Sequence, residues 1–304
     1  MAVGDIITAA RYNNAQARVA AVMGTGSSTE GYGQVLTSAQ TSTGQTVSST
    51  QVNNLYTDIT AGRIHQVGTL PATILQVNSG DIIADETSDD TLGNVGSGQY
   101  KGFTDYESLI STFESVGERF KLNVDHSTTL ISITGSITAN WNSLRTHVVR
   151  ATFVDANARR HFFNSGGTIN FTAELAGYSG AKSVDWANML SNMGSIKFDY
   201  TSTYASGSGT GTNIGNFDLT STYQQVFTKT GSGIYVENDY NIQVKEITSN
   251  VIEFLIEFRD DNAPGGYGVD ENVNGTLTSR LGTTRASGIY VNAAAPILTT
   301  TDAI

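Results

Sequence analysis

The chain has 304 residues, three prolines and no cysteine, and its 28 acidic residues outnumber its 17 basic ones. This length suits one large domain or two modest ones and is enough to bury a core without disulfide or metal support. The lack of cysteine excludes disulfides and Cys-ligated metal centres, and the net charge of −11 argues against a surface for nucleic acid phosphates.

The N-terminal 21 residues contain Arg11 and Arg18 and lack the uninterrupted apolar stretch of a signal peptide. No run anywhere in the chain approaches the ~18 apolar residues that a membrane span needs. We therefore expect a soluble chain without a leader or a membrane span.

Residues 8–23 are typical of an amphipathic helix, because apolar side chains recur in steps of three and four residues. Thr8 is in place to cap the N-terminus, and Gly24 lies where a left-handed C-cap would fall. The Gly-, Ser- and Thr-rich segment 24–46 is expected to form a connector that is too polar to hold a core.

The helical pattern returns forty residues later and predicts a second helix over 49–65, closed by Gly68. In the two copies Thr8 corresponds to Ser48, Tyr12 to Val52, Asn13-Asn14 to Asn53-Asn54, and Val19 to Ile59. We interpret residues 1–68 as a duplicated, hairpin-like helical region that anchors the chain. Its candidate assembly contacts are Tyr12, Asn13, Asn14, Val52, Asn53 and Asn54. Packing of these apolar stripes on the rest of the same chain is an equal alternative.

Residues 69–127 are expected to form a linker followed by a third helix. The linker contains an acidic tract between Asp81 and Asp90. The helix is predicted over 105–120, with Thr104 or Asp105 as its cap.

From residue 128 to the C-terminus the apolar period changes to two, which is typical of half-buried strands. The alternating runs are 131–137, 147–153, 169–173, 196–200, 240–244, 252–258 and 275–280. Together they predict a mainly β fold with added helices, in which the β-rich domain 128–304 is an antiparallel, sandwich-like structure. A short helix is expected over 186–193 and a flexible loop over 202–215.

Four features of the sequence are candidate functional sites. The glycines of 207–215 lack the spacing and context of a phosphate-binding loop, which favours a surface loop. The acidic loop 260–271 (Asp260, Asp261, Asp270 and Glu271) favours a solvated turn over a cation site. His147 is expected to be a hydrogen-bonded core residue, and Arg159-Arg160 a turn paired with acids rather than an anion clamp. We expect no enzyme activity, catalytic residue, cofactor or metal.

Two longer stretches resemble virion structural proteins of contractile-tailed cyanophages and related marine phages. They are Met23–Gln34 (MGTGSSTEGYGQ), which lies between YNN and VNN, and Trp141–Phe171. The later piece Trp186–Gly194 (WANMLSNMG) occurs there in similar order. The resemblance implies a component of the tail, neck or an appendage, assembled in the host cytoplasm, and it implies no catalytic residues.

Three hypotheses follow. The leading one is a virion structural protein that contacts other virion proteins and forms a homo-oligomer. The second is a receptor- or glycan-binding module on the particle, suggested by 13 tyrosines and polar Gly/Ser loops. The third, a polysaccharide depolymerase, has only unassigned carboxylates behind it.

Overall fold

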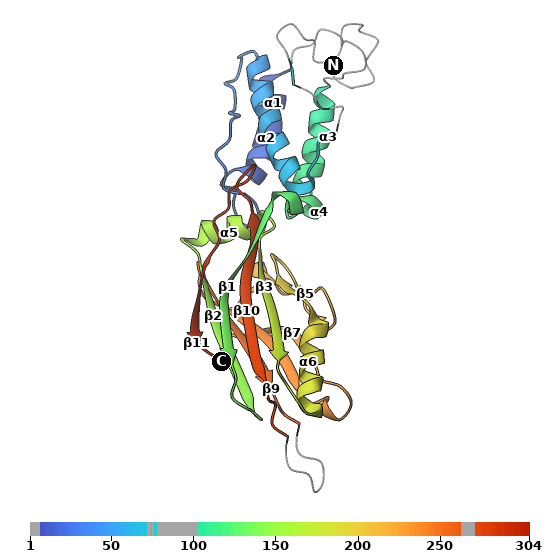
Figure 1. The fold of residues 1–304 in the computed structure, drawn as a ribbon. Coiled ribbons are helices and arrows are strands. Elements are labelled where there is room, and N and C mark those ends of the chain that lie inside the picture. The colour runs from blue at the N-terminus through green and yellow to red at the C-terminus, as the bar shows by residue number, and fades with distance from the viewer. Residues whose placement is uncertain (1–6, 72–73, 75, 78–101, 263–270) are drawn as a thin grey trace. The chain divides into compact units, whose positions relative to one another are not determined.

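The computed structural model describes the chain except for residues 1–6, 72–73, 75, 78–101 and 263–270 (Figure 1). Its contacts divide it into two compact units. The helical unit comprises Met1–Ser127, Arg160–Gly166 and Ala286–Ala293, and the β unit comprises Thr128–Arg159, Gly167–Arg285 and Ala294–Ile304. The acidic tract expected between Asp81 and Asp90 lies outside the described residues.

The helical unit contains α1 (Ala9–Met23), α2 (Ser49–Val67), α3 (Phe103–Glu114) and α4 (Val116–Arg119). The predicted N-cap of α1 is confirmed, because Thr8 accepts a hydrogen bond from the backbone of Arg11. Ser48, its counterpart in the second copy, forms a capping box with Gln51 at the start of α2. Gly68 closes α2 in the left-handed conformation at φ 82°. Gly24 does not do the same for α1, because its φ of −73° and ψ of −159° are extended.

The third helix is shorter than predicted. It begins at Phe103, so Thr104 and Asp105 lie inside its first turn, and the N-cap Gly102 offers no side chain. It ends because Ser115 is extended (φ −61°, ψ 146°), and α4 starts anew after it. The apolar period continues across this break, so hydrophobic periodicity did not reveal it.

The three long helices share one core with part of the first connector. Its buried members include Tyr12, Val19, Tyr32, Val52, Leu55, Ile59, Tyr106, Ile110 and Phe113. Tyr32 comes from segment 24–46, so the connector that was expected to be too polar to hold a core still contributes a buried ring to the core of the helices. The third helix also packs in this core. The predicted boundary between residues 68 and 69 therefore divides elements that fold together.

The β unit is a sandwich of two antiparallel sheets, which confirms the predicted fold class. One sheet has the order β1-β10-β3-β4-β5 and the other β11-β2-β9-β8-β7-β6. The strands are β1 (Ser127–Ile137), β2 (Leu144–Thr152), β3 (Thr168–Ala176), β4 (Ile196–Phe198), β5 (Thr203–Ala205), β6 (Thr210–Gly211), β7 (Gln224–Thr230), β8 (Asp239–Thr248), β9 (Val251–Arg259), β10 (Thr276–Ala286) and β11 (Ile297–Asp302).

Aromatic side chains fill the space between the two sheets. The ring of Phe254 on β9 lies 5.1 Å from Phe171 on β3 and 5.3 Å from Phe198 on β4, centroid to centroid. Helix α6 (Ala181–Met193) packs against β3 and buries Trp186 completely. These contacts join the inward faces that the period-two pattern predicted.

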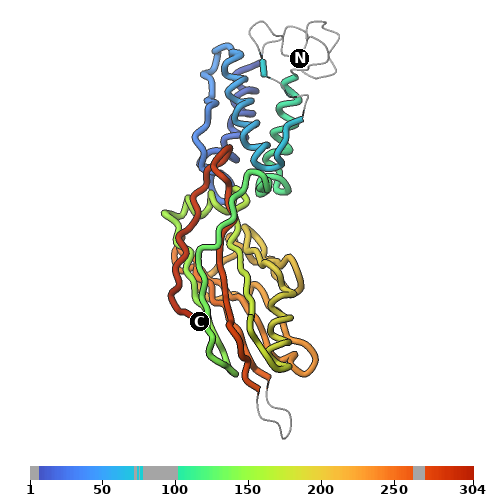
Figure 2. Tube along the Cα trace, in the orientation of Figure 1, coloured from blue at the N-terminus to red at the C-terminus, as the bar shows by residue number. Residues whose placement is uncertain are grey.

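Several elements of the structure were not predicted from the sequence. The predicted turn at Arg159-Arg160 is helix α5 (Ala156–Asn164), and the predicted loop 202–215 contains β5 and β6. Strand β7 was not predicted, nor was β11, which pairs with β2 near the C-terminus of the chain (Figure 2). These elements are short or polar, so their apolar period is too weak to read.

Candidate functional site

The duplicated asparagines hold the connectors that follow their helices. The amide of Asn13 donates to the carbonyl of Thr41 and accepts from its N–H, both at 2.8 Å. The amide of Asn53 does the same with Val77, at 2.6 and 2.7 Å. Each amide thus forms the two hydrogen bonds that a neighbouring strand would otherwise make. The sequence repeat is therefore also a repeat of structure.

The other candidate assembly residues divide into buried and accessible ones. Tyr12 is fully buried, and its hydroxyl donates to the carbonyls of Ala39 and Gln51, both at 3.1 Å. Val52 is also fully buried. Asn14 is exposed and Asn54 is half-buried. Four of the six residues thus serve the chain's own helical unit, and the predicted apolar stripes face this core.

Gln66 is a buried polar side chain within this core. Gln66 donates from its amide to the Tyr32 hydroxyl at 2.9 Å and to the Phe113 carbonyl at 3.0 Å. Nearby, the His65 ring nitrogen Nε2 lies 3.0 Å from the carbonyl oxygen of Ser165. Burial lowers the pKa of His65 to about 4, although the Ser165 carbonyl opposes this shift. These groups organise the helical core, and their polar atoms are turned inward.

Charged side chains form a ladder on the outer face of the second sheet. Glu253 on β9 accepts from Arg150 on β2 at 2.7 Å, from Tyr223 at 2.7 Å and from Lys245 on β8 at 2.9 Å. Burial acts to raise the pKa of Glu253, but these three hydrogen-bonded neighbours outweigh it and lower the pKa to about 2. The carboxylate is a fixed acceptor at the centre of the ladder.

Among the described carboxylates of the acidic loop, Asp261 and Glu271 are exposed, as predicted, and Asp260 is not. Asp260 is buried and paired with Lys182 of α6, whereas Asp261 is exposed and accepts from Arg259 at 3.1 Å. Glu271 accepts from the backbone N–H of Lys182 at 3.2 Å, and Asp270 lies outside the described residues. Within the described part of the chain, no group of three or more His, Asp or Glu side chains could hold a metal ion.

His147 is a hydrogen-bonded core residue, as predicted. Its ring nitrogens lie 3.0 Å from the hydroxyl of Ser279 on β10 and 3.3 Å from that of Thr300 on β11. Arg159 pairs with Glu246 at 2.6 Å, also as predicted. Arg160 instead donates to the Thr25 carbonyl at 2.7 Å. Both arginines are engaged within their own units rather than facing a shared anion.

The glycine-rich segment is packed rather than open. A β-carbon on Gly209 would approach the ring of Phe227 to 2.2 Å, and one on Gly211 would approach the Thr203 carbonyl oxygen to 1.9 Å. The glycines therefore let backbone and rings approach closely where β5, β6 and β7 meet. The prediction of a flexible loop is wrong for this reason.

Strand β1 forms an edge of the first sheet and has an unusual sequence. Its eleven residues (STTLISITGSI) contain no charged residue and no proline. Leu130 is 52% exposed and Ile131 63% exposed. Soluble proteins usually protect an edge strand with lysine, proline or a covering element. Strand β1 contains neither lysine nor proline.

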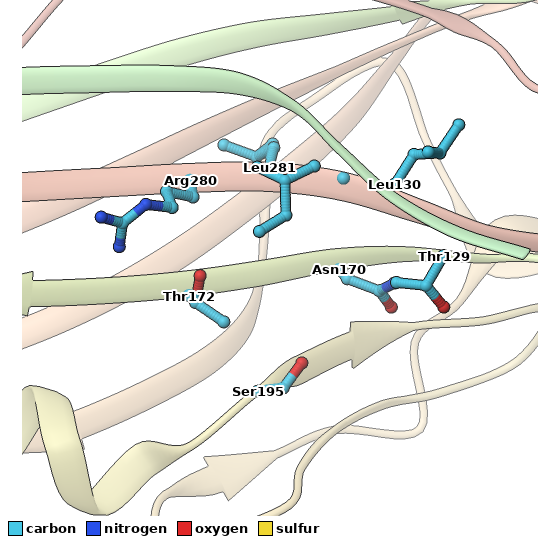
Figure 3. A pocket seen from close by; sticks show the side chains of 9 residues that line it. Thr129, Leu130, Asn170, Thr172, Ser195, Arg280 and Leu281 are labelled. Carbon is cyan, nitrogen blue, oxygen red and sulfur yellow. The ribbon is translucent and has the colours of Figure 1, made fainter.

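A hollow of about 130 Å³ lies beside β1 on the outside of the same sheet (Figure 3). Gly282 on β10 lets the backbone of β1 come close here, because a β-carbon on Gly282 would lie 2.1 Å from the Leu130 carbonyl oxygen. The lining comprises Thr129, Leu130, Ile131, Asn170, Thr172, Ser195, Arg280, Leu281 and Gly282. The exposed apolar part of β1 and this hollow together form one surface, which we call the β1 edge.

Comparisons with family models, with curated proteins and with solved structures find no match to this chain. Among the described helices, none is long and apolar enough to cross a membrane.

Proposed function

We propose that this chain is a structural subunit of a phage particle, within the tail, neck or an appendage, and that it assembles through protein–protein contacts into a homo-oligomer. The resemblance of Met23–Gln34 and Trp141–Phe171 to virion structural proteins supports the first part. The β1 edge supports the second and is the observation on which the proposal chiefly depends. On this proposal the chain assembles in the host cytoplasm and ends in the virion.

An edge strand can accept a strand from another chain, because its outward backbone N–H and C=O groups are unused by its own sheet. Pairing of this kind needs no particular side chain, but it needs an approach without repulsion. The chain carries a net charge of −11, so two copies repel each other over much of their surface. Strand β1 itself carries no charge, which lets copies meet there at low electrostatic cost.

A second copy fits this edge better than an unrelated partner does. When a strand pairs antiparallel with its own copy about a two-fold axis, residue i of one copy faces residue j of the other, and residue j faces residue i. A charged residue near the axis would therefore lie close to the same charge on the other copy, and β1 contains none. Leu130 and Ile131 add apolar area near the centre of such a contact.

The contact can be tested on the purified protein by sedimentation velocity across a range of concentrations. We expect the wild type to self-associate and Ile131→Lys to weaken association at least tenfold, since it places a charge on the edge. Ile234→Lys is the matched control, because Ile234 is 76% exposed outside any strand of the β unit. Equal association of wild type and Ile131→Lys would contradict the role of β1.

The virion role needs a separate measurement. Mass spectrometry of purified particles should find the chain in many copies per particle. Its absence, or its presence only as a trace, would contradict a structural role even if the isolated chain self-associates. A density map of the particle in which β1 is open to solvent would support the structural role in the virion but contradict self-association through β1.

A further inference from the structure

Lys182 and Asp260 form an ion pair inside the β unit. Lys182 lies in the first turn of α6 and Asp260 directly after β9, and their side chains are 2% and 1% exposed. The lysine Nζ lies 3.1 Å from each of the two carboxylate oxygens. Since both oxygens are at this distance, the carboxyl carbon between them lies within about 3.5 Å of Nζ, so a small movement of the amine over the carboxyl plane brings the two atoms into position to react.

Burial disfavours the charged form of each of these two groups. Two charges removed from water lose most of their hydration, and their mutual attraction seldom restores all of it. Transfer of one proton from the ammonium to the carboxylate would give a neutral amine facing a carboxylic acid, and a desolvated lysine amine is a nucleophile.

Neighbouring side chains hold the segments that bear Lys182 and Asp260 in place. Trp186, one turn after Lys182, packs its ring 5.0 Å from that of Trp141 and 6.4 Å from that of Phe258, two residues before Asp260. Glu271 accepts the backbone N–H of Lys182 at 3.2 Å and the Tyr235 hydroxyl at 3.1 Å. The start of α6 and the end of β9 are thus braced by one aromatic cluster, which limits drift of the amine from the carboxyl carbon.

We propose that Lys182 and Asp260 condense into an isopeptide bond. The lone pair of Nζ attacks the carboxyl carbon, a C–N bond forms, and the bond from that carbon to the acid hydroxyl breaks. The hydroxyl leaves with one amine hydrogen as water, and the product is a neutral amide. The step uses no oxidant, reductant or cofactor. It joins positions 78 residues apart in a chain that has no cysteine for a disulfide.

The mass of the intact, folded wild-type protein tests this directly. We expect it to be one water lower than the sequence mass, and digestion to yield a branched peptide that joins Lys182 to Asp260. Lys182→Arg keeps the positive charge but cannot form this amide, so it should have its full sequence mass. The ion pair of Lys245 with Glu253, at 2.9 Å but with a lysine 23% exposed, is an internal control whose peptides should stay separate.

A full sequence mass for the folded wild type would overturn the proposal and leave Lys182 and Asp260 as an ordinary buried ion pair. A water loss that persists in Lys182→Arg would overturn it as well, because dehydration would then lie elsewhere in the chain. Neither outcome depends on whether the chain belongs to a virion or pairs through β1, so this inference and the proposed function fail separately.

Discussion

The helical unit and the β unit differ in the groups that form hydrogen bonds with their backbone. In the β unit, long ladders such as β8–β9 pair the backbone with itself, and side chains such as Glu253 and Arg150 pair with each other. In the helical unit, side chains bind connector backbone directly, as Asn13 and Asn53 do. In the helical unit, single side chains therefore take the place of the ladder bonds that hold much of the backbone of the β unit.

Acid should weaken the helical unit most. The pKa of His65 is about 4 in the folded chain against 6.5 for an unperturbed histidine, so the unfolded chain binds the proton more readily. The stabilisation from neutral His65 is complete above pH 6.5, falls as the pH drops towards 4 and amounts to about 3 kcal/mol. Denaturant unfolding followed by circular dichroism from pH 7.5 to 4 measures this loss.

His65→Gln is the matching variant, because its amide can still donate to the Ser165 carbonyl but does not titrate. It should lose less stability than the wild type over the same pH range. Equal losses in the two proteins would contradict the assignment to His65. His147 in the β unit, whose pKa burial also lowers, should add a smaller acid sensitivity that both proteins share.

The hydrogen bonds of Asn13 with Thr41 and of Asn53 with Val77, which we call the asparagine clamps, sharpen the comparison further. Asn13→Ala or Asn53→Ala should each destabilise the helical unit by about 1–3 kcal/mol, since each leaves a backbone N–H and C=O without their partner. Hydrogen exchange should speed up at Thr41 in the first variant and at Val77 in the second. The exposed Asn14→Ala is the control, and a loss of similar size there would contradict the clamp.

The surface ion pairs should matter least. Arg18 on α1 binds Glu114 on α3 at 2.6 Å, but both side chains are partly exposed. Arg18→Met should cost only about 0.5 kcal/mol, and salt should reduce that cost. A thermal unfolding series at low and high salt measures it. A cost as large as that of Asn53→Ala would show that helix–helix ion pairs, rather than the clamps, dominate this unit.

The sequence predicted elements with a strong local signal. The caps Thr8 and Ser48 and the alternation along β9 could be identified because capping and side-chain direction depend on residues only a few positions apart. The break at Ser115 and strand β11 could not, because apolar residues continue through the first and are scarce in the second.

The candidate sites were predicted less well than the fold. The repeat drew attention to Asn13 and Asn53, but their partners, Thr41 and Val77, lie in connectors without any pattern. The uncharged run of β1 is visible in the sequence, yet its position at a sheet edge follows only from strand order. The acidic loop was expected to be solvated, whereas Asp260 is buried against Lys182.

The amino-acid sequence alone determined the helical repeat, the two-residue period of the main strands and the absence of thiol chemistry, since these depend on composition and short spacings. Only the tertiary structure decided which distant groups meet: Asn53 with Val77, Glu253 with Arg150, and Lys182 with Asp260. The physical reason is that such contacts depend on how whole elements pack, and local periodicity carries no information about a partner dozens of residues away.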